Sequence, residues 1–196
     1  PIKSSAASDV YKRQMRALRE EIRSAGSLNE TYEGATVFFG GGTPSLLAGE
    51  ELAGILDEVS RRLLLRSDAE ITVECNPGTL DRTKLETYKR AGVNRLSIGL
   101  QSADNRELKT LGRIHTWEQF LHNYELVREL GFANVNIDLM SALPGQTREG
   151  WLSTLEKVTN LNPEHISAYS LIVEEGTPFY ERYGEDRPQE LSLIHI

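Results

Sequence analysis

The sequence contains a single cysteine, Cys75, among its 196 residues. One thiol cannot form an internal disulfide, and it cannot by itself supply a multi-cysteine metal site within this chain. A chain without internal disulfides fits a reducing compartment, so we expect a cytoplasmic protein. We expect the Cys75 side chain to be a small buried apolar group.

Long hydrophobic runs and an excess of basic residues are also missing. The longest apolar runs are far too short to cross a bilayer, and no signal-peptide pattern opens the sequence, so we expect no transmembrane segment. A formal net charge of −7, from 22 Lys and Arg against 29 Asp and Glu, argues against a nucleic-acid partner. The remaining composition, 39% hydrophobic and 26% charged, is that of an ordinary globular protein of about one domain.

Strand-like and helix-like segments alternate along the chain. Short apolar segments predict strands at residues 35–40, 70–77, 95–101, 134–140 and 165–173. Amphipathic segments predict helices at residues 11–26, 49–64, 81–92, 104–110, 116–130 and 147–161. Asp81 is expected to cap its helix, with Gly92 just past the helix end. This alternation indicates an α/β fold with parallel strands joined by crossover helices.

Both a (β/α) barrel and a doubly wound open sheet satisfy this alternation. Unusual residues lie at or near the C-terminal ends of four successive strands: Gly41, Glu74, Gln101 and Asp138. In a barrel these ends form one mouth, where ligands bind. In an open sheet they would be strung along an edge, with only a crevice at the switch point to gather them. The pattern therefore favours the barrel.

The segment TVFFGGGTPSLL, residues 36–47, places three consecutive glycines after a strand. It is not a Walker A phosphate loop, because no lysine follows the glycines. A tight strand-to-helix turn is one explanation. Ligand binding is another, since three glycines remove every Cβ from a stretch of backbone and expose its N–H and C=O groups to a ligand.

Each polar residue near a strand end has two possible roles. Alternation over residues 71–76 places Glu74 on a polar face, which points to the lumen of a barrel; a salt bridge to a neighbouring helix is the alternative. Asp138 is a similar acid in an apolar strand. Gln101 suits either a ribose hydroxyl or a loop cap, and Arg113 either a ligand carboxylate or the surface. The four histidines lack partners at metal-binding spacing, so we interpret them as structural or incidental.

Together these segments resemble the radical S-adenosylmethionine (radical SAM) superfamily. More narrowly, they resemble the oxygen-independent coproporphyrinogen III oxidase family and its HemW-type heme chaperones. The resemblance runs from about Met15 to about Arg187 and rests on FFGGGTPSLL, ITVECNPGTLD, AGVNRLSIGLQS, LGRIH, GFANVNIDLMSALPGQT and LNPEHISAYSLIVEEGTPFY. LGRIH and ISAYSLIVEEGTPFY favour the HemW branch.

The resemblance implies a partial, TIM-like (β/α)₆ barrel that holds S-adenosylmethionine against a [4Fe-4S] cluster. The glycine-rich loop would line the methionine end of the cofactor through Gly41, Gly42 and Thr43. The other cofactor-binding residues that the resemblance implies are Glu74, Gln101, Arg113, Asp138 and, through its backbone, Ile172. On this interpretation the glycines are bare so that a small zwitterion can lie against them.

The chain departs from the family pattern in two ways. The family binds its cluster with a C-x-x-x-C-x-x-C loop after the first barrel strand, and it carries a C-terminal domain; this sequence contains neither. We therefore expect an incomplete core over residues 15–187, between tails at 1–14 and 188–196 that are non-native or disordered. The strand near residues 36–40 should keep an unpaired edge, which predicts aggregation unless another chain covers it.

Three functions follow as hypotheses. The parent protein would act in heme or porphyrin metabolism, either in heme delivery or through radical chemistry on a porphyrinogen. Alternatively it would be a non-catalytic heme chaperone that retains the barrel, with heme as a further ligand. A third hypothesis is an unrelated barrel enzyme whose glycine loop holds a phosphate. Without cluster cysteines, this chain by itself is expected to be inactive.

Overall fold

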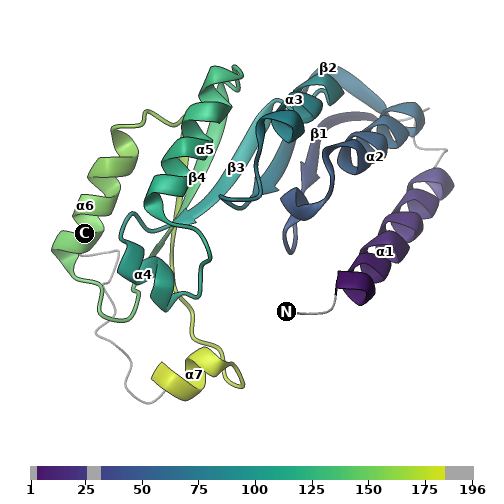
Figure 1. Cartoon of the computed structure of the whole chain (residues 1–196). Coiled ribbons are helices and arrows are strands. Elements are labelled where there is room, and N and C mark those ends of the chain that lie inside the picture. Colours follow the sequence, from purple (N-terminus) through teal and green to yellow (C-terminus); the bar gives the residue numbers. More distant parts are fainter. Residues whose placement is uncertain (1–3, 26–31, 184–196) are drawn as a thin grey trace.

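Five parallel strands form one curved sheet in the computed structural model, which describes residues 4–25 and 32–183. The strands are β1 (Glu33–Phe39), β2 (Leu64–Cys75), β3 (Arg95–Gln101), β4 (Asn134–Ser141) and β5 (His165–Ser170). Each pairs in parallel with the next along the chain, in the order β1-β2-β3-β4-β5. A doubly wound sheet would reverse its strand order at a switch point. The unbroken order and the curl of the sheet (Figure 1) confirm the barrel prediction, as a half-barrel.

Helices cover the convex face of this half-barrel (Figure 1). Helix α1 packs on α2, and the Arg23 guanidinium of α1 pairs with the Glu58 carboxylate of α2. The helices are α1 (Ser4–Ser24), α2 (Gly49–Arg62), α3 (Arg82–Ala91), α4 (Asn105–Thr110), α5 (Trp117–Glu129), α6 (Arg148–Thr159) and α7 (Pro178–Tyr183), with a 3₁₀ turn η2 at Pro44–Leu46. No helix among the described residues is long and apolar enough to cross a membrane.

Helix α3 begins and ends at the residues that the sequence predicts. The Asp81 carboxylate accepts a hydrogen bond from the backbone N–H of Lys84 at 2.8 Å, so one otherwise unpaired amide of the first turn is satisfied. Gly92 ends the helix at φ 102°, in the left-handed region that glycine enters without steric cost. Both predictions are confirmed.

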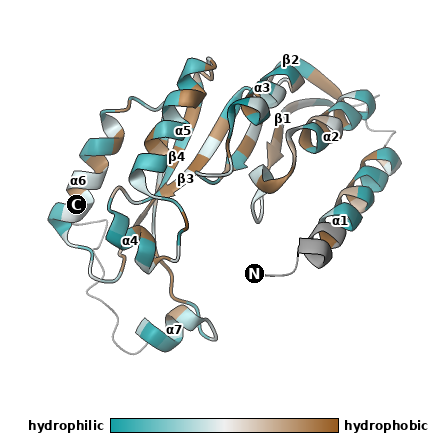
Figure 2. Ribbon diagram, viewed as in Figure 1, coloured by the Kyte–Doolittle hydropathy of each residue, from teal (hydrophilic) through white to brown (hydrophobic). Residues whose placement is uncertain are grey.

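The hydrophobic core lies between the sheet and the helices. Alternate residues of the strands face it, among them Val73 and Cys75 of β2, and Figure 2 shows hydrophobic residues concentrated along β3 and β4. Helix α5 adds Phe120, and α6 adds Trp151, both almost fully buried. Cys75 is 3% exposed, and burial raises the pKa of its thiol. The prediction of a buried apolar cysteine is confirmed, and the other face of β2, β3 and β4 carries Glu74, Ser97 and Asp138.

Several element ends differ from the prediction. Helix α1 begins at Ser4 rather than at residue 11, so residues 4–14 of the expected tail are helical, since each added residue gains a backbone hydrogen bond. Strand β2 begins at Leu64 rather than at residue 70, because Leu64 and Leu65 pair with the start of β1. Helix α7 was not predicted. Gly26 and the segment 188–196 lie outside the described residues.

The two edges of the described sheet are β1 and β5. Strand β1 pairs with β2 on one side, and among the described residues its other side has no strand partner. This is the unpaired edge expected from the sequence. The self-association expected from it stays a prediction.

Candidate functional site

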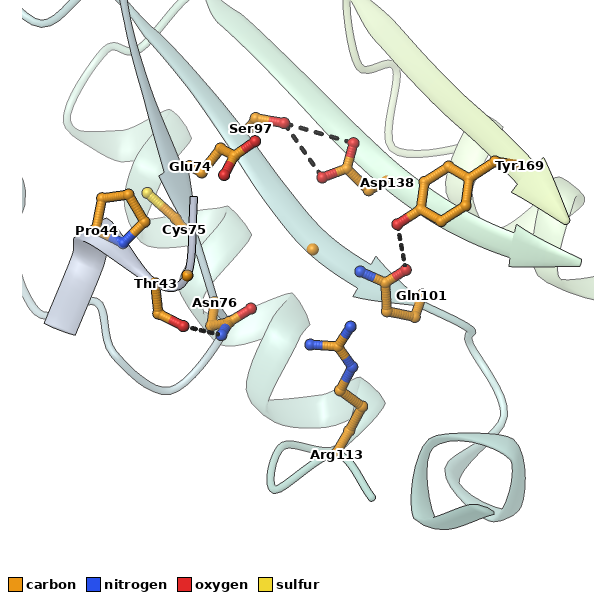
Figure 3. A pocket seen from close by; sticks show the side chains of 12 residues that line it. Thr43, Pro44, Glu74, Cys75, Asn76, Ser97, Gln101, Arg113, Asp138 and Tyr169 are labelled. Carbon is orange, nitrogen blue, oxygen red and sulfur yellow. Dashed lines mark hydrogen bonds between the residues drawn. The ribbon is translucent and has the colours of Figure 1, made fainter. Parts of the chain in front are cut away.

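The C-terminal ends of the strands enclose one pocket on the concave face of the half-barrel (Figure 3). Its volume is about 240 Å³, slightly below the 300–1,000 Å³ typical of small-molecule sites. The residues that line it are Gly42, Thr43, Pro44, Glu74, Cys75, Asn76, Ser97, Gly99, Gln101, Arg113, Asp138 and Tyr169. Six of the eight predicted site residues are among them.

Gly41 and Gly42 form the turn that closes one side of the pocket. Their φ angles of 80° and 62° lie in the left-handed region, which explains glycine at both positions as a tight turn. A Cβ added to either would meet nothing within 4 Å, so the space beside them is also open to a ligand. The Gly41 N–H donates to Glu74 Oε2 at 3.1 Å, which ties the loop to β2.

A polar cluster that the sequence did not reveal anchors the rest of this loop. The fully buried Ser45 hydroxyl accepts hydrogen bonds from the Asn76 N–H at 3.1 Å and from the Thr79 hydroxyl at 2.7 Å. Lys84 Nζ donates to the backbone oxygens of Ser45 and Thr79, at 2.6 and 2.9 Å. Asn76 Nδ2 also donates to Thr43 Oγ1 at 3.3 Å. The glycine-rich loop is therefore fixed to the β2–α3 connection, far away in sequence.

The two acids of the pocket point to the concave side, as predicted. Among the described residues, Glu74 forms no salt bridge, so the alternative of an ion pair with a helix is not found. Asp138 accepts hydrogen bonds from Asn136 Nδ2 at 2.7 Å and from the Ser97 hydroxyl at 3.2 Å. Both carboxylates thus keep lone pairs that can accept further hydrogen bonds.

Gln101 occupies a strained position at the end of β3. Its φ of 74° is rare for a residue other than glycine, the residue is 4% exposed, and the β3–β4 register shifts beside it. The Tyr169 hydroxyl donates to Gln101 Oε1 at 2.9 Å, which orients the amide (Figure 3). Burial raises the pKa of Tyr169, so this hydroxyl is a donor at neutral pH. Sequence reasoning missed Tyr169, although alternation with Ser167 on β5 could have indicated it.

Arg113 reaches into the pocket from the loop after α4. Figure 3 shows its guanidinium opposite Glu74 and Asp138. The side chain is half-buried, and within the described ranges its guanidinium has neither an ion pair nor a hydrogen bond. The loop itself is held by buried His115, whose Nε2 lies 3.1 Å from the Leu100 carbonyl oxygen and so acts as the donor. This contact fits the structural interpretation of that histidine.

Two predicted residues are absent from the pocket lining, Gly41 and Ile172, although the Gly41 N–H donates to the lining residue Glu74. Ile172 follows the end of β5 and is 79% exposed. Its expected contact is through the backbone, so its role stays a prediction.

The charges of the pocket restrict the ligands it can hold. Glu74 and Asp138 supply two negative charges, whereas Arg113 supplies one positive charge. A phosphate would gain from Arg113 but be repelled by two carboxylates, so the arrangement disfavours a phosphate-binding site. A ligand with a carboxylate at one end and hydroxyl or ammonium groups at the other would match all three side chains.

No group of three His, Cys, Asp or Glu side chains suited to a metal ion is found among the described residues. Cys75, the one cysteine of the chain, has its side chain in the core, and its thiol resists ionisation. A [4Fe-4S] cluster needs several thiolates, so the residues of this chain do not fit one.

Comparison with known proteins gives a consistent result. Residues 3–158 match the Radical SAM superfamily. The heme chaperone HemW of Escherichia coli is 48% identical over 147 residues, which cover 75% of this chain and 39% of that protein. HemW of Bacillus subtilis is 39% identical over 181 residues, covering 90% and 48%.

A solved structure extends the comparison to the fold. Coproporphyrinogen III oxidase (HemN) from Escherichia coli, a radical SAM enzyme, superimposes with a TM-score of 0.76 at 29% identity. The match covers 82% of this chain and 37% of that one. The chain therefore spans less than half the length of each of these three relatives.

Proposed function

Because this chain belongs to the radical SAM superfamily, we propose that its pocket binds S-adenosylmethionine. The observation that carries this proposal is the meeting of Glu74, Gln101 and Asp138 in one pocket, opposite the guanidinium of Arg113, which has no ion pair among the described residues. These groups suit a ligand that is at once a zwitterion and a nucleoside.

Each part of the ligand has a partner of matching chemistry. Arg113 would hold the carboxylate, since a guanidinium donates two parallel hydrogen bonds to such a group. The open backbone at Gly41, Gly42 and Thr43 would receive the methionine end, with carbonyl oxygens for the ammonium group. The Asp138 carboxylate and the Gln101 amide would bind the ribose hydroxyls, as acceptor and as donor.

The cofactor supplies the difficult chemistry in this superfamily, as a source of radicals beside a [4Fe-4S] cluster. The contribution of this chain is to bind and orient the cofactor. Because its residues do not fit a cluster, we expect it to be inactive by itself. Anaerobic reconstitution with iron and sulfide should leave no stoichiometric [4Fe-4S] absorbance, and a full cluster spectrum would contradict this.

Titration calorimetry tests cofactor binding directly. We expect S-adenosylmethionine to bind at one site, and Glu74→Gln to weaken that binding. Glu125→Gln, on the outer surface of α5, is the matched control and should leave the affinity unchanged. Binding of sugar phosphates, with no heat from S-adenosylmethionine, would instead support the phosphate-binding alternative.

For the whole protein we propose a role in heme metabolism, as a heme chaperone rather than as a porphyrinogen oxidase. The curated relatives at 48% and 39% identity bear the name heme chaperone HemW, whereas the oxidase structure is 29% identical. The test uses the full-length protein. We expect it to bind heme and pass it to an acceptor, without decarboxylating coproporphyrinogen III. Decarboxylation in that assay would instead support the oxidase.

A further inference from the structure

Asn136 lies on the concave face of β4, two residues before Asp138 and just below the pocket. The residue is 2% exposed and does not line the pocket. A buried amide is costly unless its donors and acceptors are all paired, so its hydrogen bonds show what the position does.

The amide of Asn136 uses its full hydrogen-bonding capacity. Nδ2 donates to the Ser97 hydroxyl at 2.8 Å and to Asp138 Oδ1 at 2.7 Å. Oδ1 accepts from the Ser167 hydroxyl at 3.1 Å and from His165 Nδ1, which is the donor because the amide oxygen can only accept. These partners lie on β3, β4 and β5. The amide is therefore locked by three strands and cannot turn without losing several bonds.

This arrangement leaves the two oxygens of Asp138 in different environments. Oδ1 accepts from Asn136 at 2.7 Å and from Ser97 at 3.5 Å, whereas among the described residues Oδ2 accepts only from Ser97, at 3.2 Å. A carboxylate oxygen can accept about two hydrogen bonds, so Oδ2 keeps the greater capacity for a ligand donor. Without Asn136, the Asp138 side chain would be free to adopt other rotamers, because Ser97 alone would hold it.

We propose that Asn136 is a positioning residue for ligand binding, acting through Asp138. It holds the carboxylate in the one orientation that presents Oδ2 to the hydroxyl groups of the bound nucleoside. This inference rests on the proposed binding of S-adenosylmethionine, and it adds a residue that has no contact with the pocket itself.

The experiment is a double-mutant cycle read by titration calorimetry with S-adenosylmethionine. Asn136→Ala should weaken binding about tenfold, on the scale of one hydrogen bond to a charged group. In an Asp138→Ala background the same change should have almost no further effect, because the group through which Asn136 acts is gone. A merely structural role would give the same loss in both backgrounds. That equal loss, or wild-type affinity of Asn136→Ala, overturns the proposal.

Asn94→Ala is the matched control. The oxygen of the Asn94 amide accepts a hydrogen bond from the Ile71 N–H, and its nitrogen donates one to the Ala69 carbonyl. This amide is therefore also paired at both polar atoms, but it lies away from the pocket. Asn94→Ala should lower the stability measured by urea unfolding without changing the affinity for S-adenosylmethionine. If Asn136→Ala does not fold, Asn136→Ser is used in its place. This variant keeps a hydroxyl donor, so the expected loss of affinity is smaller.

Crystal structures of the folded variants separate this proposal from the proposed function. If wild-type protein does not bind S-adenosylmethionine, the proposed function fails, but the rotamer of Asp138 still decides the role of Asn136. Asp138 in a new or mixed rotamer in Asn136→Ala supports positioning. An unchanged Asp138 side chain overturns it.

Discussion

Replacing Arg113 by glutamine gives the sharpest test of how the pocket distinguishes its ligand. The guanidinium is half-buried and, among the described residues, has no carboxylate partner. If it meets the carboxylate of S-adenosylmethionine, Arg113→Gln removes a charge-assisted interaction that no other pocket cation can replace. Arg113→Lys keeps the charge but loses the planar fork, so its effect should be intermediate.

The expected magnitude follows from the environment of the guanidinium. Hydrogen bonds to charged groups contribute about 1.5–3 kcal/mol, which corresponds to about 10- to 150-fold in the dissociation constant. Because the Arg113 side chain is half-buried rather than enclosed, water screens part of the attraction. We therefore expect a loss near the lower limit, about tenfold.

The assay compares two ligands by calorimetry, S-adenosylmethionine and its decarboxylated form. Arg113→Gln should weaken the first and leave the second almost unchanged, because only the first carries a carboxylate. Arg106→Gln, at a 93% exposed arginine of α4 that pairs with Asp104, is the control and should change neither. An equal loss for both ligands would refute a contact with the carboxylate. Unchanged affinity for both would show that Arg113 does not contact the ligand.

Four further predictions concern single features of the structure. Tyr169→Phe should weaken S-adenosylmethionine binding about two- to tenfold in calorimetry, since Gln101 loses the bond that orients its amide; wild-type affinity would contradict this. Cys75 should resist thiol reagents in the native protein and react only after unfolding, because burial raises its pKa; rapid native labelling would be inconsistent with the core. Burial lowers the pKa of His115, so below about pH 6.5 the unfolded chain binds a proton that the folded protein resists, and stability falls as the pH decreases. Urea unfolding at pH 7.5 and 5.5 should show a smaller pH effect in His115→Gln, and an equal effect would refute this. Light scattering should show self-association through the open edge of β1, and a stable monomer would count against it.

The faces of the strands were predictable because they follow from alternation alone. The segment ITVEC places Val73 and Cys75 on one side and Glu74 on the other, and the structure has them in the core and in the pocket, respectively. The barrel was predictable because polar residues end successive strands. The ends of an element were not predictable where they depend on pairing with a distant segment. Leu64, for example, pairs with Glu33 and extends β2.

The hydrogen bonds that support the pocket could not be predicted from the sequence, for the same reason. Nothing in the local sequence connects Lys84 to the Ser45 carbonyl, since the two residues are 39 positions apart. Tyr169 and Gln101 are separated by 68 positions and meet only because β3, β4 and β5 are neighbours at their C-terminal ends. A single sequence gives the residue types along each strand, whereas the register between strands decides which of them touch.

That register explains why the two acids of the pocket are held in different ways. Asp138 is fixed from below, by Asn136 two residues earlier on its own strand and by Ser97, the β3 residue that pairs with Asn136. Among the described residues Glu74 has no such support, because Thr72 beneath it donates to Glu70. The Gly41 N–H of the loop above fixes Glu74 instead. Substitutions below the pocket should therefore alter the position of the Asp138 side chain alone. Substitutions in the glycine-rich loop should alter that of Glu74.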